Sequence, residues 1–168
     1  MTCLVELPGY GARERAEILD GEQDAAGVDG LGLVWRDKIG HVVLRRDGRL
    51  IAHAGWLPIE LSVGGRAAAV GLGGVLIHRS FRGQGLGATV VEAATDRMRQ
   101  LGSPIGLLFC TNARVHFYER LGWRALRTEV TVDQPEGPVT MPIRTCWLPL
   151  SAEAPPPSEP LALAGLPF

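Results

Sequence analysis

A glycine-rich hexapeptide in the middle of the chain has the residue types of an anion-binding site. It reads Arg82-Gly83-Gln84-Gly85-Leu86-Gly87 and lies between the apolar run Val75-Leu76-Ile77 and the helical run Ala88–Leu101. A strand, a tight turn and a helix in this order point several backbone N–H groups at one spot, at the positive end of the helix dipole. Glycines let the backbone approach a bulky anion, and Arg82 and Gln84 add side-chain donors. The turn therefore predicts a site for a pyrophosphate-bearing cofactor.

Two common nucleotide-binding patterns do not fit this turn. A P-loop ends in Gly-Lys-Ser/Thr, whereas the only lysine of the chain is Lys38. A dinucleotide fingerprint has the spacing G-x-G-x-x-G, usually early in the chain, whereas Gly83, Gly85 and Gly87 give G-x-G-x-G in mid-chain. For the hexapeptide taken alone, an ordinary tight turn remains the alternative.

A second segment makes the interpretation more specific. The short apolar strand Gly106–Cys110 is followed by Thr111–Trp123, which contains Phe-Tyr-x-x-x-Gly-Trp from Phe117 onward. Together with Arg-x-x-Gly-x-Gly after a strand, this segment resembles the GNAT superfamily of N-acetyltransferases, and the resemblance covers roughly Arg49 to Leu126. It implies a mixed α/β GNAT fold, with a twisted, mostly antiparallel central sheet flanked by helices, and acetyl-CoA as co-substrate.

The resemblance also assigns roles along the two motifs. The backbone of Val75-Leu76-Ile77 would bind the pantetheine arm in a gap between splayed strands, with a strand N–H facing the thioester oxygen. Asn112 would bond the arm, cap the next helix, or both. Tyr118 would be the general acid for the leaving sulfur, and a core tyrosine is the alternative. The expected cofactor-binding residues are Val75, Leu76, Ile77, Arg82, Gly83, Gln84, Gly85, Leu86, Gly87, Ala88, Asn112 and Tyr118.

The general base is the least defined part of the expected site. Many members of the superfamily carry a glutamate on the strand before the glycine turn, where this chain has Gly73. The remaining candidates are His53, His78, Glu60, the terminal carboxylate of Phe168 and an ordered water. An acceptor amine with a pKa of about 8 would need little help from a base.

Within the superfamily, three segments together resemble the aminoglycoside 2′-N-acetyltransferase branch, namely Gly48–Ala54, the glycine turn and Tyr118–Trp123. Trp35 and His41 fit that branch loosely, as does the closing Gly-Leu-Pro-Phe. The residues expected to contact the acceptor are Trp35, His53, Glu60 and Phe168.

The predicted function is transfer of the acetyl group of acetyl-CoA to a primary amine of a small cationic acceptor, such as an aminoglycoside. The amine would attack directly in a ternary complex. The alternatives are an enzyme that acetylates a protein, peptide or amino-acid amine, and a non-catalytic acetyl-CoA-binding sensor.

Composition agrees with a soluble globular protein. The chain has 168 residues, 46% apolar and 21% charged, and a net charge of −1, so we expect one domain over 1–168 and no nucleic-acid partner. We see no signal peptide or membrane span and expect a cytoplasmic protein, and the arginine-rich, lysine-poor composition is typical of a GC-rich bacterial genome. Three widely spaced cysteines predict neither a disulfide framework nor a metal site.

Charge is distributed unevenly along the chain. Residues 1–37 hold eight acids against three arginines, and residues 79–127 hold eight arginines against three acids. A basic region around the glycine turn suits a polyanionic cofactor, and an acidic one suits a cationic acceptor, although a solvated surface explains the acidic half equally well.

The elements that must position these residues follow from apolar runs and turn residues. We expect a helix over Gly11–Gln23, a loop over Asp24–Gly32, and a second helix after the glycine turn. The expected strands are Val42–Leu44, Leu50–Leu57, Ile59–Val63, Ala67–Ile77, Gly106–Cys110, Ala125–Val132 and Pro138–Leu148, with hairpin turns at Asp47-Gly48, Gly64-Gly65 and Gln134–Gly137.

The end of the chain carries two further expectations. The Pro-rich segment Ala152–Pro160 reads as a linker, and we expect Leu161–Phe168 beyond it to dock on the domain near the acceptor cleft. The late strands Ala125–Val132 and Pro138–Leu148 could pair between two subunits, so a homodimer is one expected partner state.

Overall fold

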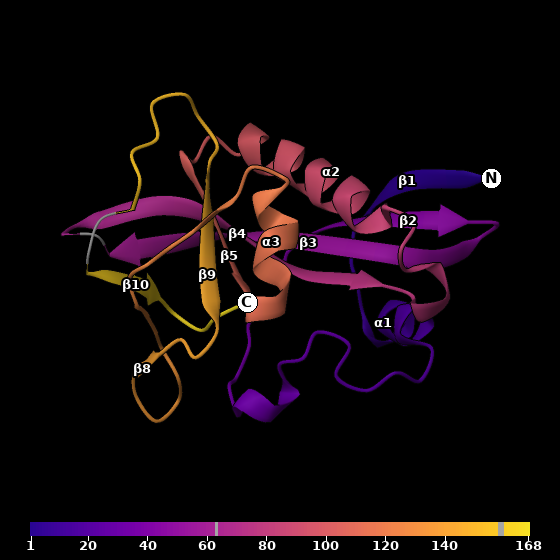
Figure 1. The fold of residues 1–168 in the computed structure, drawn as a ribbon, viewed down its shortest axis with the longest axis horizontal. Coiled ribbons are helices and arrows are strands. Elements are labelled where there is room, and N and C mark those ends of the chain that lie inside the picture. The colour runs from indigo at the N-terminus through magenta and orange to yellow at the C-terminus, as the bar shows by residue number, and fades with distance from the viewer. Residues whose placement is uncertain (63, 158–159) are drawn as a thin grey trace.

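The computed structural model describes residues 1–62, 64–157 and 160–168 (Figure 1). Over these residues the strands are β1 (Thr2–Leu7), β2 (Gly40–Arg46), β3 (Arg49–Ser62), β4 (Arg66–Ile77), β5 (Ile105–Cys110), β6 (Arg124–Ala125), β7 (Val130–Val132), β8 (Val139–Thr140), β9 (Arg144–Pro149) and β10 (Leu161–Ala164). The α-helices are α1 (Ala12–Leu19), α2 (Leu86–Gln100) and α3 (Val115–Glu119), and the 3₁₀ turns are η1 (Asp29–Leu31), η2 (Arg79–Phe81) and η3 (Asn112–Arg114).

The strands of the described chain form one curled mixed sheet, which confirms the expected fold class. Its order is β6-β9-β5-β4-β3-β10-β7-β8, and β2 pairs with β3 on the first half of that long strand, with β1 outside it. The β2–β3 hairpin turns at Asp47 (φ 51°) and Gly48 (φ 84°), as the sequence predicts, because both positions of this tight turn need positive φ.

Helices α1 and α2 cover opposite faces of the sheet (Figure 1). Alternation along β2 determines which side chain meets which helix. Val42 and Leu44 share an apolar cluster with residues of α2, whereas Val43 packs with Ile18 of α1.

Strands β4 and β5 run parallel but pair over only four residues. Ala69 to Leu72 face Ile105 to Leu108, and β4 then continues from Gly73 to Ile77 without a partner on this side. Its other edge stays paired with β3, where a bulge shifts the register between His53 and Gly55. The two strands therefore diverge toward the glycine turn and leave a gap at the centre of the sheet.

Several expected elements differ from the observed ones in length. The helix predicted over Gly11–Gln23 ends at Leu19, because Asp20 adopts a left-handed cap with φ 49°. The segment Thr111–Trp123, which resembles the strand-helix unit of the superfamily, contains only the 3₁₀ turn η3 and the five residues of α3. Strand β1 is absent from the sequence prediction, and Val63 of the predicted strand Ile59–Val63 lies outside the described residues.

Both late strands are interrupted. Pro138–Leu148 divides into β8 and β9 around Pro142, since proline cannot donate a ladder hydrogen bond. Ala125–Val132 divides into β6 and β7 because the segment changes partner, from β9 to β10.

The C-terminal segment is part of the sheet. Strand β10 lies between β3, which it pairs antiparallel, and β7, which it pairs parallel. The chain then crosses toward the gap, and Figure 1 shows its end near the centre of the molecule. Phe168 is buried there, with its ring tilted against Phe109 of β5 at 5.1 Å between centroids.

Candidate functional site

A cleft of about 1360 Å³ lies at the gap between β4 and β5. The glycine turn and α3 border one half of it, and the segment from Pro8 to His41, together with Phe168, borders the other half. The volume exceeds what a small ligand needs, so the cleft can hold two reactants in contact. We call the half at the glycine turn the donor half and the other the acceptor half.

The glycine turn has the backbone that its sequence predicts. Gly83 (φ 76°) and Gly85 (φ 77°) both occupy the left-handed region that favours glycine, and a Cβ at either position would meet no atom within 4 Å. Helix α2 begins directly afterwards at Leu86, and no side chain caps its first N–H groups. Fifteen residues of helix thus direct their dipole and unpaired N–H groups at the donor half.

Beside the turn, β4 presents an open edge to the cleft. Val75, Leu76 and Ile77 line it, and the backbone approaches them through Gly74, whose φ is 61°. Gly74 lies at the β-bulge between β3 and β4, and bulges re-aim the backbone next to ligand sites. The free N–H and C=O groups of this edge can pair with an extended amide-bearing chain such as a pantetheine arm.

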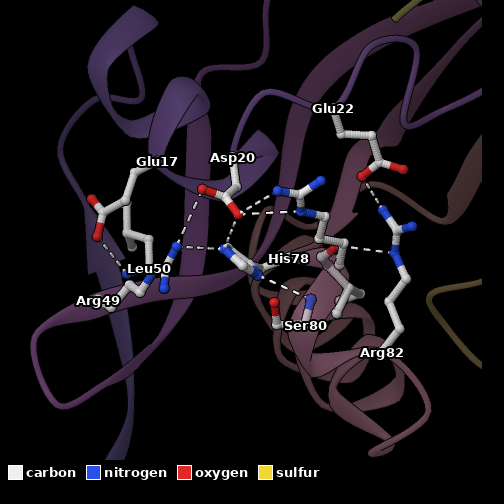
Figure 2. A network of polar contacts seen from close by, with 10 residues as sticks. Glu17, Asp20, Glu22, Arg49, Leu50, His78, Ser80 and Arg82 are labelled. Carbon is white, nitrogen blue, oxygen red and sulfur yellow. Dashed lines mark hydrogen bonds and ion pairs between the residues drawn. The ribbon is translucent and has the colours of Figure 1, made fainter.

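Arg82 and Gln84 have partners within the protein. The Arg82 guanidinium pairs with Glu22 and its Nε donates to the carbonyl of Ile77 at 3.2 Å (Figure 2). Gln84 accepts a hydrogen bond from Arg46 at 3.2 Å and, unlike Arg82, does not line the cleft. An anion in the donor half would therefore compete with Glu22 for the Arg82 guanidinium.

A polar network next to Arg82 fastens α1 to the ends of β3 and β4 (Figure 2). Asp20 accepts from Arg79 at 3.1 Å and lies 3.5 Å from Arg49 and 3.6 Å from Nε2 of His78. His78 is fully buried in this network and its Nδ1 accepts from the N–H of Ser80 at 3.1 Å. The histidine therefore belongs to the wall behind the donor half and not to the cleft.

Tyr118 of α3 lines the donor half. Its ring packs edge-on against Phe117 and Trp123, at 4.9 and 6.4 Å between centroids, and only 8% of the residue is exposed. Burial raises the pKa of the Tyr118 phenol, so the hydroxyl stays protonated at neutral pH and can donate. Asn112, in η3 of the same region, does not line the cleft, whereas its neighbour Thr111 does.

In the acceptor half, the structure brings together three of the four predicted residues. Trp35, His53 and Phe168 line the cleft. Glu60 does not; it lies toward the far end of β3, opposite Ala164 of β10, in an ion pair with Arg66 at 3.3 Å.

His53 belongs to a stacked cluster with Tyr10 and His41. Its Nδ1 lies 2.6 Å from the carbonyl of Gly74 and must donate to it, so its Nε2 accepts from Nδ1 of His41 at 3.1 Å. The Tyr10 ring stacks on His53 at 3.7 Å between centroids. Burial lowers the pKa of His53 to about 3, which keeps the ring neutral. Tyr10 carries no motif, and its proximity to His53 could not be read from the sequence.

Lys38 occupies the space above Gly73. A Cβ at Gly73 would lie 2.7 Å from Cε of Lys38 and 3.2 Å from the carbon and an oxygen of the terminal carboxylate of Phe168. A larger residue at position 73 therefore does not fit the present arrangement. The sequence does single out Lys38 as the only lysine, but it gives no sign that this side chain lies on the strand before the turn.

The acids of residues 1–37 serve mainly the fold. Six of them bind within the protein, either to arginines or to backbone N–H groups: Glu6, Glu14, Glu17, Asp20, Glu22 and Asp24. The other two, Asp29 and Asp37, line the cleft together with the cations Arg15 and Lys38. The acceptor half is thus nearly balanced in charge.

None of the helices in the described parts of the chain combines the length and apolar character needed to cross a membrane.

Comparison with known proteins supplies the context for this cleft. The model of the family described as "Acetyltransferase (GNAT) family" matches residues 14–123. No curated protein sequence matches the chain.

Solved structures share the fold at low sequence identity. A GNAT family N-acetyltransferase, YhbS from Escherichia coli in complex with CoA, is 16% identical, with a TM-score of 0.67 over 98% of this chain and 89% of that one. The ribosomal-protein-S18-alanine N-acetyltransferase from Escherichia coli is 16% identical, with a TM-score of 0.59 over 90% and 95%. A GNAT family acetyltransferase from Brucella melitensis in complex with acetyl-CoA is also 16% identical, with a TM-score of 0.53 over 74% and 84%.

Proposed function

The chain belongs to the acetyltransferase (GNAT) family, and from this premise we propose that it transfers the acetyl group of acetyl-CoA to the primary amine of a small acceptor. The single observation that carries the proposal is the cleft in the parted sheet. It joins an uncapped helix N-terminus with a glycine turn, an open strand edge and a protonated tyrosine hydroxyl in one space.

The donor half fits the parts of acetyl-CoA in order. The N–H groups at Leu86, Gly87 and Ala88 offer donors for a pyrophosphate, since Gly83 and Gly85 before them leave room for it. The free edge of Val75–Ile77 offers sheet-like hydrogen bonds to the pantetheine amides and an N–H toward the thioester oxygen. The cleft residues therefore match the chemistry of this co-substrate.

The proposed reaction is direct attack of the amine on the thioester within a ternary complex. The edge N–H of β4 stabilises the charge that develops on the carbonyl oxygen, and Tyr118 donates a proton to the departing sulfur. Because the Tyr118 pKa is raised, the proton is available over the whole physiological pH range.

The acceptor half favours a compact amine. Phe168, Trp35 and Tyr10 place aromatic surface around it, and the C-terminal segment borders it from β10. Asp29 and Asp37 are the acids that a cationic acceptor can reach. Our narrower proposal, based on sequence motifs, is an aminoglycoside-like acceptor, and a peptide or protein amine is the alternative that a more open cleft would suit.

The test is release of free thiol from acetyl-CoA in the presence of single acceptors. Separate reactions contain aminoglycosides, polyamines, amino acids and short peptides, each with a control that lacks the acceptor. Acceptor-dependent thiol release with one of the small amines supports the proposal. Thermal stabilisation by acetyl-CoA without release from any acceptor would instead favour a sensor.

A further inference from the structure

We propose that Lys38 is the general base that removes a proton from the acceptor ammonium, in the place that Gly73 leaves without a carboxylate. The inference deepens the proposed function and rests on it. The proposed proton acceptor lies where the donor and acceptor halves of the cleft meet. It comes from the loop before β2 and not from strand β4.

The Lys38 side chain packs over three glycines, Gly55, Gly73 and Gly74, which leave room for it because they have no side chain. A Cβ at Gly55 would lie 2.9 Å from both Cβ and Cγ of Lys38, and one at Gly73 would lie 2.7 Å from its Cε. Gly55 and Gly73 are register partners on β3 and β4, so the aliphatic stem crosses the two strands at one level. Beyond them, Cε is still 3.7 Å from the Cβ position of Gly74, the residue that leads into the open edge at Val75. Cε of Lys38 thus lies beside the residues that lead into the open edge of β4, and the amino group is one bond farther along the side chain.

The ammonium of Lys38 has acidic groups near it but forms no close ion pair within the ranges that the structure describes. Asp37 is the acidic neighbour, while Arg15 opposes the positive charge and the rings of His41 and His53 are neutral. The carboxyl end of Phe168 faces Gly73 from the other side. No carboxylate of the described residues lies within 4.0 Å of the Lys38 nitrogen, because none of the ion pairs there includes it.

Burial accordingly lowers the pKa of Lys38 to about 8. At pH 7 about one-tenth of such a side chain is neutral, compared with less than one in a thousand for an ordinary lysine. A base whose pKa lies near the working pH is partly present in its neutral form and still binds a proton well.

Three other titratable side chains of the cleft, His53, Tyr118 and Tyr10, are less suited. Both ring nitrogens of His53 are engaged, one with Gly74 and one with His41, and its depressed pKa makes it a poor proton acceptor. Tyr118 and Tyr10 both have raised pKa values and stay protonated. Among these four side chains, Lys38 is therefore the one suited to take a proton from an ammonium at neutral pH, and the terminal carboxylate of Phe168 is the competing base that the variants below distinguish from it.

The proposed step balances in protons and bonds. Neutral Nζ of Lys38 takes one proton from the acceptor ammonium, and the free amine attacks the thioester carbon. The C–N bond forms, the C–S bond breaks, and sulfur takes the Tyr118 proton while the new amide nitrogen gives up its second proton to restore the phenol. Lys38 returns its own proton to solvent, so each turnover releases one proton.

The first test titrates Lys38 directly, without turnover. Because it is the only lysine, protein grown with [13Cε]lysine gives one lysine signal, whose chemical shift is followed from about pH 6 to about pH 11. We expect a midpoint near pH 8. A midpoint above pH 10 would overturn the proposal, because the side chain would then be cationic throughout the working range.

The second test separates proton transfer from positive charge and from packing. Lys38→Met keeps an aliphatic side chain packed over the three glycines, and Lys38→Arg keeps the positive charge. Arg66→Met removes an exposed cation outside the cleft and is the matched control. We expect both Lys38 variants to lose about 10²-fold in kcat with the Kd for acetyl-CoA unchanged, and Arg66→Met to keep its activity. Activity retained by Lys38→Arg would overturn the base role in favour of a purely electrostatic one.

Two further readouts make the test specific. With a fluorinated acceptor analogue whose amine is already neutral at pH 7, the loss in Lys38→Met should shrink to less than tenfold, since no ammonium proton needs to be removed. Mass spectrometry of the wild-type protein after incubation with acetyl-CoA should find Lys38 unmodified. A stably acetylated Lys38 would overturn the proposal, because the side chain would then be a nucleophile.

A further pair of variants tests whether a carboxylate at position 73 can replace Lys38 as the base. Gly73→Glu alone should be inactive, because a Cβ at position 73 would lie 2.7 Å from Cε of Lys38, whereas Lys38→Ala with Gly73→Glu should recover at least tenfold over Lys38→Ala alone. Wild-type protein without turnover on any acceptor would contradict the proposed function itself. Active wild type with an equally active Lys38→Met would contradict only the assignment of the base.

Discussion

The buried histidine at the centre of the cleft should make the protein sensitive to mild acid. His53 is 2% exposed, and burial lowers its pKa from an ordinary 6.5 to about 3. Between these two values the unfolded chain binds a proton that the folded protein rejects, so stability is complete above pH 6.5 and is lost as the pH falls toward 3. From about pH 7.5 to about pH 5, the loss from this group alone is ~2 kcal/mol.

The assay is urea unfolding followed by tryptophan fluorescence at both pH values, for wild type, His53→Gln and His116→Gln. Glutamine can still donate to Gly74 but has no proton to gain, so His53→Gln should lose ~2 kcal/mol less than wild type between the two pH values. His116, whose side chain is 80% exposed, is the matched control and should follow wild type. An identical pH dependence in wild type and His53→Gln would refute the reasoning that this ring is held neutral by burial.

Three further substitutions test other parts of the cleft. Tyr118→Phe should reduce kcat about 10²-fold with the Kd for acetyl-CoA nearly unchanged, as calorimetry and steady-state kinetics can show; unchanged kcat would exclude the acid role. Phe168→Ala should raise the KM for the acceptor about tenfold, because it removes a buried ring from the acceptor half, and a larger effect on the KM for acetyl-CoA would mean that the residue is only structural. Arg82→Ala should weaken acetyl-CoA binding about tenfold, whereas Glu22→Gln should strengthen it by releasing Arg82; equal weakening by both would show that the pair acts only as a tether.

The parts of the molecule that the sequence predicts well are local in the chain. The glycine turn can be predicted from its own residues, because Gly83 and Gly85 adopt the positive φ that favours glycine, and α2 follows the turn directly. The Asp47-Gly48 hairpin is predicted for the same reason. Alternating apolar residues then place the strands around these turns and yield the fold class.

The parts that could not be predicted depend on contacts between distant segments. Lys38 reaches Gly73 only because the loop before β2 crosses β3 at Gly55, and no spacing in the chain encodes that crossing. The acids near the N-terminus look like a cationic-acceptor surface until their partners, such as Arg82 for Glu22, are seen. Pro142 interrupts a run that periodicity alone reads as one strand.

The most direct test of the central claim is acceptor-dependent release of thiol from acetyl-CoA, with the acetylated product identified by mass spectrometry. We predict thiol release only when a small primary amine is present, and a product heavier by one acetyl group on nitrogen. Tight binding of acetyl-CoA with no acetylated product from any small amine or peptide would contradict the claim that this cleft catalyses N-acetyl transfer.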